Sequence, residues 1–256
     1  MDIIEIKNLE IFANHGVFPE ENVFGQKFVV SAKLYTSTRK AGLTDDLTAS
    51  IHYGEVSQML LHEFPLMNAI TLRIEKPWAP VGLPLDTVAV EITRGWHTTY
   101  VAFGSNLGDK KKYIDDGIQG LKDTPDCEVE AVSEYLVTEP YGDVEQDEFL
   151  NGVLRLRTLL TPEELLDRFH ELEAAANRER IIHWGPRTLD LDILFYDNEI
   201  IDTPDLHIPH IDMENRDFVL KPLDEIAPYY RHPVLNKTIH QLLTEPVSYT
   251  HLTLPT

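Results

Sequence analysis

Cysteine, positive charge and long apolar runs are all scarce in this 256-residue chain. Cys127 is the single cysteine, which excludes a disulfide framework and a thiolate metal cluster. The 22 Lys and Arg against 43 Asp and Glu give a formal net charge of −21, which argues against nucleic acid or an anionic membrane as a partner. No apolar run has bilayer-spanning length, and the acidic start, Met1–Glu5, does not resemble a signal peptide. We therefore expect a cytoplasmic protein.

Two widespread nucleotide-binding motifs are also absent. The chain contains neither a Gly-x-x-x-x-Gly-Lys phosphate loop nor a Gly-x-Gly-x-x-Gly fingerprint, which excludes P-loop and Rossmann interpretations. What remains is ordinary globular composition, 43% hydrophobic and 25% charged, in a chain long enough for two modest domains.

The distribution of β-branched and apolar residues predicts an α+β protein with a domain boundary near residue 97. The first domain, 1–97, is expected to hold strands at 2–12, 26–38, 69–75 and 87–93 and one helix at 54–64. The second, 98–246, is expected to hold strands at 99–104, 128–138, 149–158 and 188–196 and helices at 108–122 and 161–177. This order predicts a ferredoxin-like sheet with helices on one face, followed by a loop-rich appendage at 197–226. Residues 247–256 are expected to form an unstructured tail.

The stretch His183–Asp192 concentrates the chemistry of the chain. Its alternation predicts a half-buried strand that points Asp190 and Asp192 to one face, roughly 6–7 Å apart. Paired carboxylates suit a hard cation such as Mg²⁺ that also holds substrate phosphates, and Arg187 offers a planar fork of donors to phosphate. The plainer alternative is an edge strand with two solvent-facing acids. The basic island at 178–187, three Arg against one Glu, favours a nucleotide-phosphate site.

This stretch resembles the signature of the 6-hydroxymethyl-7,8-dihydropterin pyrophosphokinase family, and the resemblance extends over roughly residues 99–243. Three further segments match in order: Gly104–Asp109, Phe149–Asn151 and Pro209–Phe218. The resemblance implies Mg²⁺-dependent transfer of pyrophosphate from ATP to 6-hydroxymethyl-7,8-dihydropterin, with AMP leaving, in folate biosynthesis. Another nucleotide-dependent transferase on the same fold is disfavoured, because both the pterin side and the phosphate side match.

The resemblance also implies roles for individual residues. Asp190 and Asp192 would hold two Mg²⁺ ions with ATP, and Arg178 and Arg187 would act on the phosphates. The binding residues would be Thr138, Phe149, Asn151, Glu173, Arg180, Trp184, His210, Arg216 and Phe218. Taken alone, Asn151 would be a turn residue, the two Phe core residues, His210 a surface residue and Glu173 part of a solvated helix face. His183 and Ile211 depart from the family, which often has Arg before the Trp and an aromatic or basic residue after the His.

Residues 1–97 resemble dihydroneopterin aldolase, a tunnelling-fold (T-fold) family that assembles into symmetric oligomers. The matching segments are Asn14–Gly16, Glu20–Gln26, Ile51–Val56 and Leu72–Pro77. Lys76, Tyr53 and Glu21 match catalytic positions of that family. Between the Tyr53 segment and Lys76 the family carries two helices, whereas this chain has room for one, so a helical segment is missing near 57–60. We expect aldolase activity to be absent or impaired; alternatively, this half is a non-catalytic homo-oligomerisation module.

Overall fold

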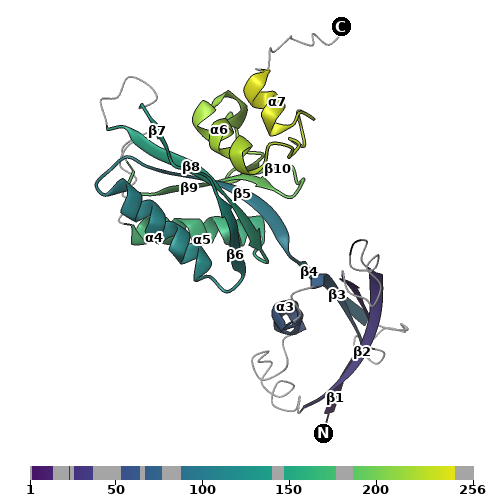
Figure 1. Cartoon of the computed structure of the whole chain (residues 1–256). Coiled ribbons are helices and arrows are strands. Elements are labelled where there is room, and N and C mark those ends of the chain that lie inside the picture. The colour runs from purple at the N-terminus through teal and green to yellow at the C-terminus, as the bar shows by residue number, and fades with distance from the viewer. Residues whose placement is uncertain are drawn as a thin grey trace. The chain divides into compact units, whose positions relative to one another are not determined.

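The computed structural model describes residues 2–13, 23, 26–36, 53–63, 67–76, 88–139, 147–176 and 187–245. The chain divides into two compact units, Met1–Trp96 and His97–Thr256. Both combine helices with antiparallel sheets, which confirms the α+β class (Figure 1).

The first unit contains a four-stranded antiparallel sheet in the order β2-β1-β3-β4. Its elements are β1 (Asp2–Ala13), β2 (Gln26–Thr36), α3 (Tyr53–Glu63), β3 (Met67–Lys76) and β4 (Val88–Gly95). Helix α3 contacts β3 and β4. It buries Ser57 and Leu61 while Met59 is exposed, as expected for a helix with one face against a sheet.

The second unit is built on a sheet in the order β6-β8-β5-β9, with β7 paired beside part of β8. Its strands are β5 (His97–Ser105), β6 (Cys127–Val132), β7 (Leu136–Thr138), β8 (Phe149–Thr158) and β9 (Asp190–Tyr196). All neighbours are antiparallel. Helix α4 (Lys110–Lys122) follows β5, and α5 (Pro162–Ala175) follows β8. This is the predicted β-α-β-β-α-β order, in which β5 and β6 flank β8.

Helices α4 and α5 cover one face of this sheet (Figure 1). The predicted start of α5 is confirmed: Thr161 and Glu164 form a reciprocal capping box, and Pro162 lies in the first turn. Leu165 and Phe169 of α5 are fully buried against the sheet. Burial of that kind gives α5 a fixed position relative to the strands.

The two predicted helices do lie on one face, but the opposite face is covered as well, and the prediction of a loop-rich appendage at 197–226 missed a helix. The appendage contains the hairpin β10 (Ile201–Asp202) and β11 (His207–Ile208), the 3-10 turn Met213–Asn215, α6 (Asp217–Ile226) and, beyond it, α7 (Ile239–Thr244). Helices α6 and α7 form a second core with Tyr100, Val153 and Phe195 of the sheet. Helix α6 is short and contains Pro222, a residue that usually ends or kinks a helix and so argues against one in the sequence.

The predicted strand 128–138 is likewise interrupted, because β6 ends at Val132 and β7 begins at Leu136. Ser133 explains the break. Its backbone N–H donates to the Val153 carbonyl at 2.9 Å, while its hydroxyl accepts from the Val153 N–H at 3.0 Å. Since a side chain replaces the main-chain acceptor there, the backbone leaves the ladder before β7 rejoins β8.

Among the described residues no helix has the length and apolarity needed to cross a membrane.

Candidate active site

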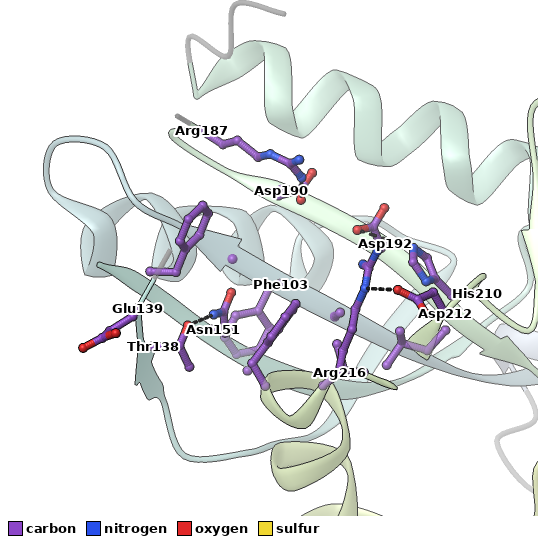
Figure 2. A pocket seen from close by; sticks show the side chains of 17 residues that line it. Phe103, Thr138, Glu139, Asn151, Arg187, Asp190, Asp192, His210, Asp212 and Arg216 are labelled. Atoms are coloured by element: carbon purple, nitrogen blue, oxygen red, sulfur yellow. Dashed lines mark hydrogen bonds and ion pairs between the residues drawn. The ribbon is translucent and has the colours of Figure 1, made fainter. Parts of the chain in front are cut away.

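A cavity of about 230 Å³ lies in the second unit, between the central strands, the loop after β11 and the first turn of α6 (Figure 2). The alternation of β9 creates its floor. Leu191 and Ile193 join the core beneath α4 and α5, whereas Leu194 belongs to the core of α6 and α7. Asp190 and Asp192 lie on the side of β9 that Leu194 occupies, and all three line the cavity. The two carboxylates therefore lie on the face of the sheet that α6 and α7 cover, at the part of β9 that lines the cavity.

Charged groups of both signs surround this acidic pair. Arg187 forms an ion pair with Asp190, and His210 Nε2 lies 4.0 Å from the nearer carboxylate oxygen of Asp192. Burial, reinforced by the Arg216 guanidinium, holds the pKa of His210 below its ordinary value of 6.5. Arg216 lies 3.5 Å from the Asp212 carboxylate and also faces the Phe218 ring. This side of the cavity suits anionic phosphates.

The donor set fits Mg²⁺ that is shared with a nucleotide. Within the described ranges, no group of three or more His, Cys, Asp or Glu side chains is arranged to hold a metal ion by itself. Mg²⁺ with phosphates typically needs only one or two protein carboxylates, the remaining positions being filled by phosphate oxygens and water. Asp190 and Asp192 supply that number, with 17% and 44% of their side chains exposed.

The other side of the cavity is aromatic and amide-lined. Asn151 of β8 is 8% exposed, and its amide Nδ2 donates to the Thr138 hydroxyl of β7 at 2.8 Å. Phe149 and Phe218 line the same cavity. Gly104 of β5 makes room for the amide, since a Cβ there would stand 2.7 Å from Asn151 Oδ1. Flat apolar walls with one oriented amide suit a planar heterocycle that carries donors and acceptors.

The structure brings most of the described candidate residues into this one cavity. Those lining it are Thr138, Phe149, Asn151, Arg187, Asp190, Asp192, His210, Arg216 and Phe218. They come from strands β7, β8 and β9, from the loops before β9 and after β11, and from the start of α6. Arg178, Arg180, Trp184 and Glu21 lie outside the described residues. Of the other aldolase positions, Tyr53 is the first residue of α3 and Lys76 the last of β3.

Glu173 lies elsewhere, and both interpretations of it from sequence need correction. It is not among the residues that line the cavity, and at 3% exposure it is not on a solvated helix face. Its carboxylate points from α5 to the main chain of β9, where it accepts the Leu191 N–H at 3.0 Å. Helix α5 packs on the face of the sheet opposite to the aspartates, which explains the displacement.

Asn106 is a buried residue of the site for which the sequence predicted no role. Its Oδ1 accepts the Arg187 N–H at 2.7 Å, and its own N–H donates to the Arg187 carbonyl at 3.0 Å. The amide Nδ2 also reaches the Asp147 carbonyl, just before β8, at 3.5 Å. Asn106 therefore ties the segments that precede β8 and β9 to the end of β5. The sequence feature that could have identified Asn106 is its position within the Gly104–Asp109 motif.

Two family models match separate parts of the chain. Residues 100–228 match the model described as 7,8-dihydro-6-hydroxymethylpterin-pyrophosphokinase, and residues 4–60 match the model described as dihydroneopterin aldolase. The second match ends within α3, before β3 begins, so the aldolase-related part is short.

Relatives match either about half of this chain or most of it. The 2-amino-4-hydroxy-6-hydroxymethyldihydropteridine pyrophosphokinase of Pseudomonas aeruginosa is 42% identical over 134 residues, covering 52% of this chain and 83% of the relative. The bifunctional protein FolKE of Lactococcus lactis subsp. cremoris is 49% identical over 129 residues, 50% of this chain and 37% of FolKE. The folic acid synthesis protein FOL1 of Dictyostelium discoideum is 30% identical over 291 residues, 94% of this chain and 44% of FOL1. This chain thus spans less than half the length of FolKE or FOL1.

The fold and cavity define a class: a ferredoxin-like α+β unit with a carboxylate pair and Arg beside an aromatic, amide-lined hollow. Within that class, the chain belongs to the 7,8-dihydro-6-hydroxymethylpterin-pyrophosphokinase family.

Proposed function

We propose that the second unit transfers pyrophosphate from ATP to 6-hydroxymethyl-7,8-dihydropterin. The pterin hydroxymethyl oxygen would bond to the β-phosphorus of ATP, the bond from that phosphorus to the oxygen of AMP would break, and the hydroxyl proton would be released. The observation that carries this proposal is the two-sided cavity, with Asp190, Asp192 and Arg187 on one side and Asn151 and the aromatic rings on the other. Relatives that bear the name of this activity support it.

The work of the protein would be positioning and charge neutralisation, as in phosphoryl transfer generally. Asp190 and Asp192 would hold the Mg²⁺ ions that accompany ATP, and bound Mg²⁺ would neutralise phosphate charge. Arg187 would exchange its ion pair with Asp190 for contacts to phosphate, while Arg216 would bind a second phosphate group. Arg178, Arg180 and Trp184 remain proposed partners of the phosphates and the pterin.

On the pterin side, the Asn151 amide would face the polar edge of the ring, oriented by its bond to Thr138. Phe149 and Phe218 would contact the ring itself. Together these contacts would hold the hydroxymethyl group toward the phosphate side.

The test is pterin-dependent AMP release by the whole chain and by Asp192→Asn, which keeps the shape of the side chain but removes its charge. We expect the variant to release AMP about 100-fold more slowly or worse, because a preorganised charge at the reacting phosphates is lost. Asp167→Asn on the exposed face of α5 is the matched control and should match the parent. Equal rates in Asp192→Asn and the parent would contradict the proposed site.

For the first unit we propose no aldolase catalysis. The aldolase match ends at residue 60, within α3 (Tyr53–Glu63), and strand β3 begins at Met67. The truncated T-fold, the roles of Tyr53, Lys76 and Glu21, and the alternative of an oligomerisation module all remain predictions. Light scattering of the whole chain tests the last of these, since a monomer would exclude it.

A further inference from the structure

Glu173 is a buried carboxylate that lies outside the cavity but contacts the strand that forms its floor. It is third from the end of α5 and only 3% exposed, and it accepts the Leu191 N–H through Oε1 at 3.0 Å. Leu191 is equally buried and separates Asp190 from Asp192. A helix side chain thus holds the main chain at the midpoint of the acidic pair.

The place of β9 in the sheet explains why this bond is needed. In the described sheet β9 stands at the end of the order β6-β8-β5-β9, so one of its two edges faces β5 and the other does not. Leu191 lies opposite Phe103 of β5, and its N–H is turned to the outer edge, toward α5. A buried N–H on such an edge requires an acceptor from outside the sheet. Glu173 supplies that acceptor.

We infer that Glu173 is a positioning residue that sets the placement of Asp190 and Asp192. The Leu191 nitrogen belongs to the peptide that joins Asp190 to Leu191, so fixing its direction fixes the main chain from which both carboxylates project. Helix α5 can transmit a fixed position because Leu165 and Phe169 are fully buried and its first turn is capped. The inference rests on the proposed function, since it assigns Glu173 a role in holding the phosphate side of that site.

The chemistry of the acceptor provides the distinguishing variants. Glu173→Gln retains an oxygen acceptor at the same reach, whereas Glu173→Leu keeps a similar volume and removes the acceptor. Glu173→Asp retains the charge but draws the carboxylate back by one methylene. If placement matters, Asp should behave like Leu, and Gln should behave like the parent. Glu171→Leu is the matched control on α5, because Glu171 is exposed and pairs only at the surface with Arg168.

The first measurement is amide hydrogen exchange at Leu191 in the ligand-free whole chain. We expect exchange at least about tenfold faster in Glu173→Leu and Glu173→Asp, and parent-like exchange in Glu173→Gln and Glu171→Leu, because only in the first two is no acceptor oxygen within reach of the Leu191 N–H. Parent-like exchange in folded Glu173→Leu and Glu173→Asp would overturn the inference. If Glu173→Leu does not fold, Glu173→Asp and Glu173→Gln still form the decisive pair.

The second measurement is steady-state AMP release with the KM values for ATP and pterin separated. For Glu173→Asp we expect kcat/KM for ATP with Mg²⁺ to fall about 10- to 100-fold, as small displacements of catalytic groups do, and Glu173→Gln to restore most of it. The KM for the pterin should stay within about twofold of the parent, since Asn151 and Thr138 are held by other strands. Faster Leu191 exchange with unchanged kinetics would overturn the positioning role. If the parent itself releases no AMP, the proposed function fails, while the exchange experiment still tests the Glu173 contact.

Discussion

At the scale of single residues, Gly104 controls the pterin side of the site. A Cβ at this position would stand 2.7 Å from Asn151 Oδ1, so Gly104→Ala must push the amide from its bond with Thr138. We predict that the KM for the pterin rises about tenfold, the equivalent of one hydrogen bond, while the KM for ATP stays unchanged. Steady-state kinetics with each substrate varied in turn measure both constants. Equal rises in the two KM values would show general distortion and contradict the prediction.

Asn106 acts on the phosphate side through the main chain of Arg187. Asn106→Ala leaves the Arg187 N–H without its side-chain acceptor, and we predict a loss of about 1–3 kcal/mol in the free energy of unfolding together with a lower kcat. Urea unfolding and AMP release measure the two effects. Asn198→Ala, in an exposed turn, is the control. An Asn106→Ala variant with parental stability and kcat would contradict the prediction. It would show that the main-chain hydrogen bond from Asn106 to Arg187 is enough to hold Arg187 in place.

At the scale of elements, the turn between α6 and α7 depends on a neutral histidine. His232 is buried, and its Nδ1 accepts the N–H groups of Val234 and Leu235 at 3.2 Å each. Burial lowers the pKa of His232 below its ordinary value of 6.5. The unfolded chain therefore binds more protons than the folded chain below about pH 6.5, so the free energy of unfolding falls as pH falls until the folded-state pKa is passed.

A substitution isolates this contribution. His232→Asn keeps an acceptor near Nδ1 but cannot titrate, so we predict a smaller loss of stability between pH 7.5 and 5.5 than in the parent. Urea midpoints at the two pH values provide the measurement. The pKa of His210 is also lowered, so this residue should cause part of the loss in the free energy of unfolding in both proteins. An identical loss in parent and variant would contradict the assignment to His232.

At the scale of elements, the sequence predicts the features that depend only on neighbouring residues. The alternation along β9 and the capping box of α5 are properties of consecutive residues, and the structure contains both. The break at Ser133 depends on hydrogen bonds to Val153 across the sheet, and α6 depends on burial against a distant face. The first leaves no local signal in the sequence, and for the second Pro222 argues against a helix. The same limit applies to Glu173, whose partner Leu191 belongs to another element.

At the scale of the whole molecule, the site is assembled from residues that are far apart in the sequence. Thr138, Asn151, Asp192 and Phe218 reach one cavity from separate parts of the chain. The paired aspartates and Arg187 are suggested by their own spacing, whereas Asn151 and Phe218 alone would pass for turn and core residues. Resemblance to a family supplied those candidates, and the cavity supplies the physical reason for grouping them.

The shortened first unit leads to a separate prediction. The aldolase match ends at residue 60, within α3, and β3 begins at Met67. We predict no glycolaldehyde release from 7,8-dihydroneopterin by the whole chain, because the sequence leaves no room for the second helix that anchors the pterin in the aldolase family. A chromatographic assay for glycolaldehyde, run beside the AMP assay on the same preparation, tests this. Robust release would show that the unit retains a working aldolase site.

The most direct test of the central claim is ³¹P NMR of the whole chain with ATP, Mg²⁺ and 6-hydroxymethyl-7,8-dihydropterin. Attack at the β-phosphorus predicts AMP and a diphosphate ester of the pterin, formed only when the pterin is present. Formation of ADP and inorganic phosphate, or consumption of ATP without the pterin, would contradict the account.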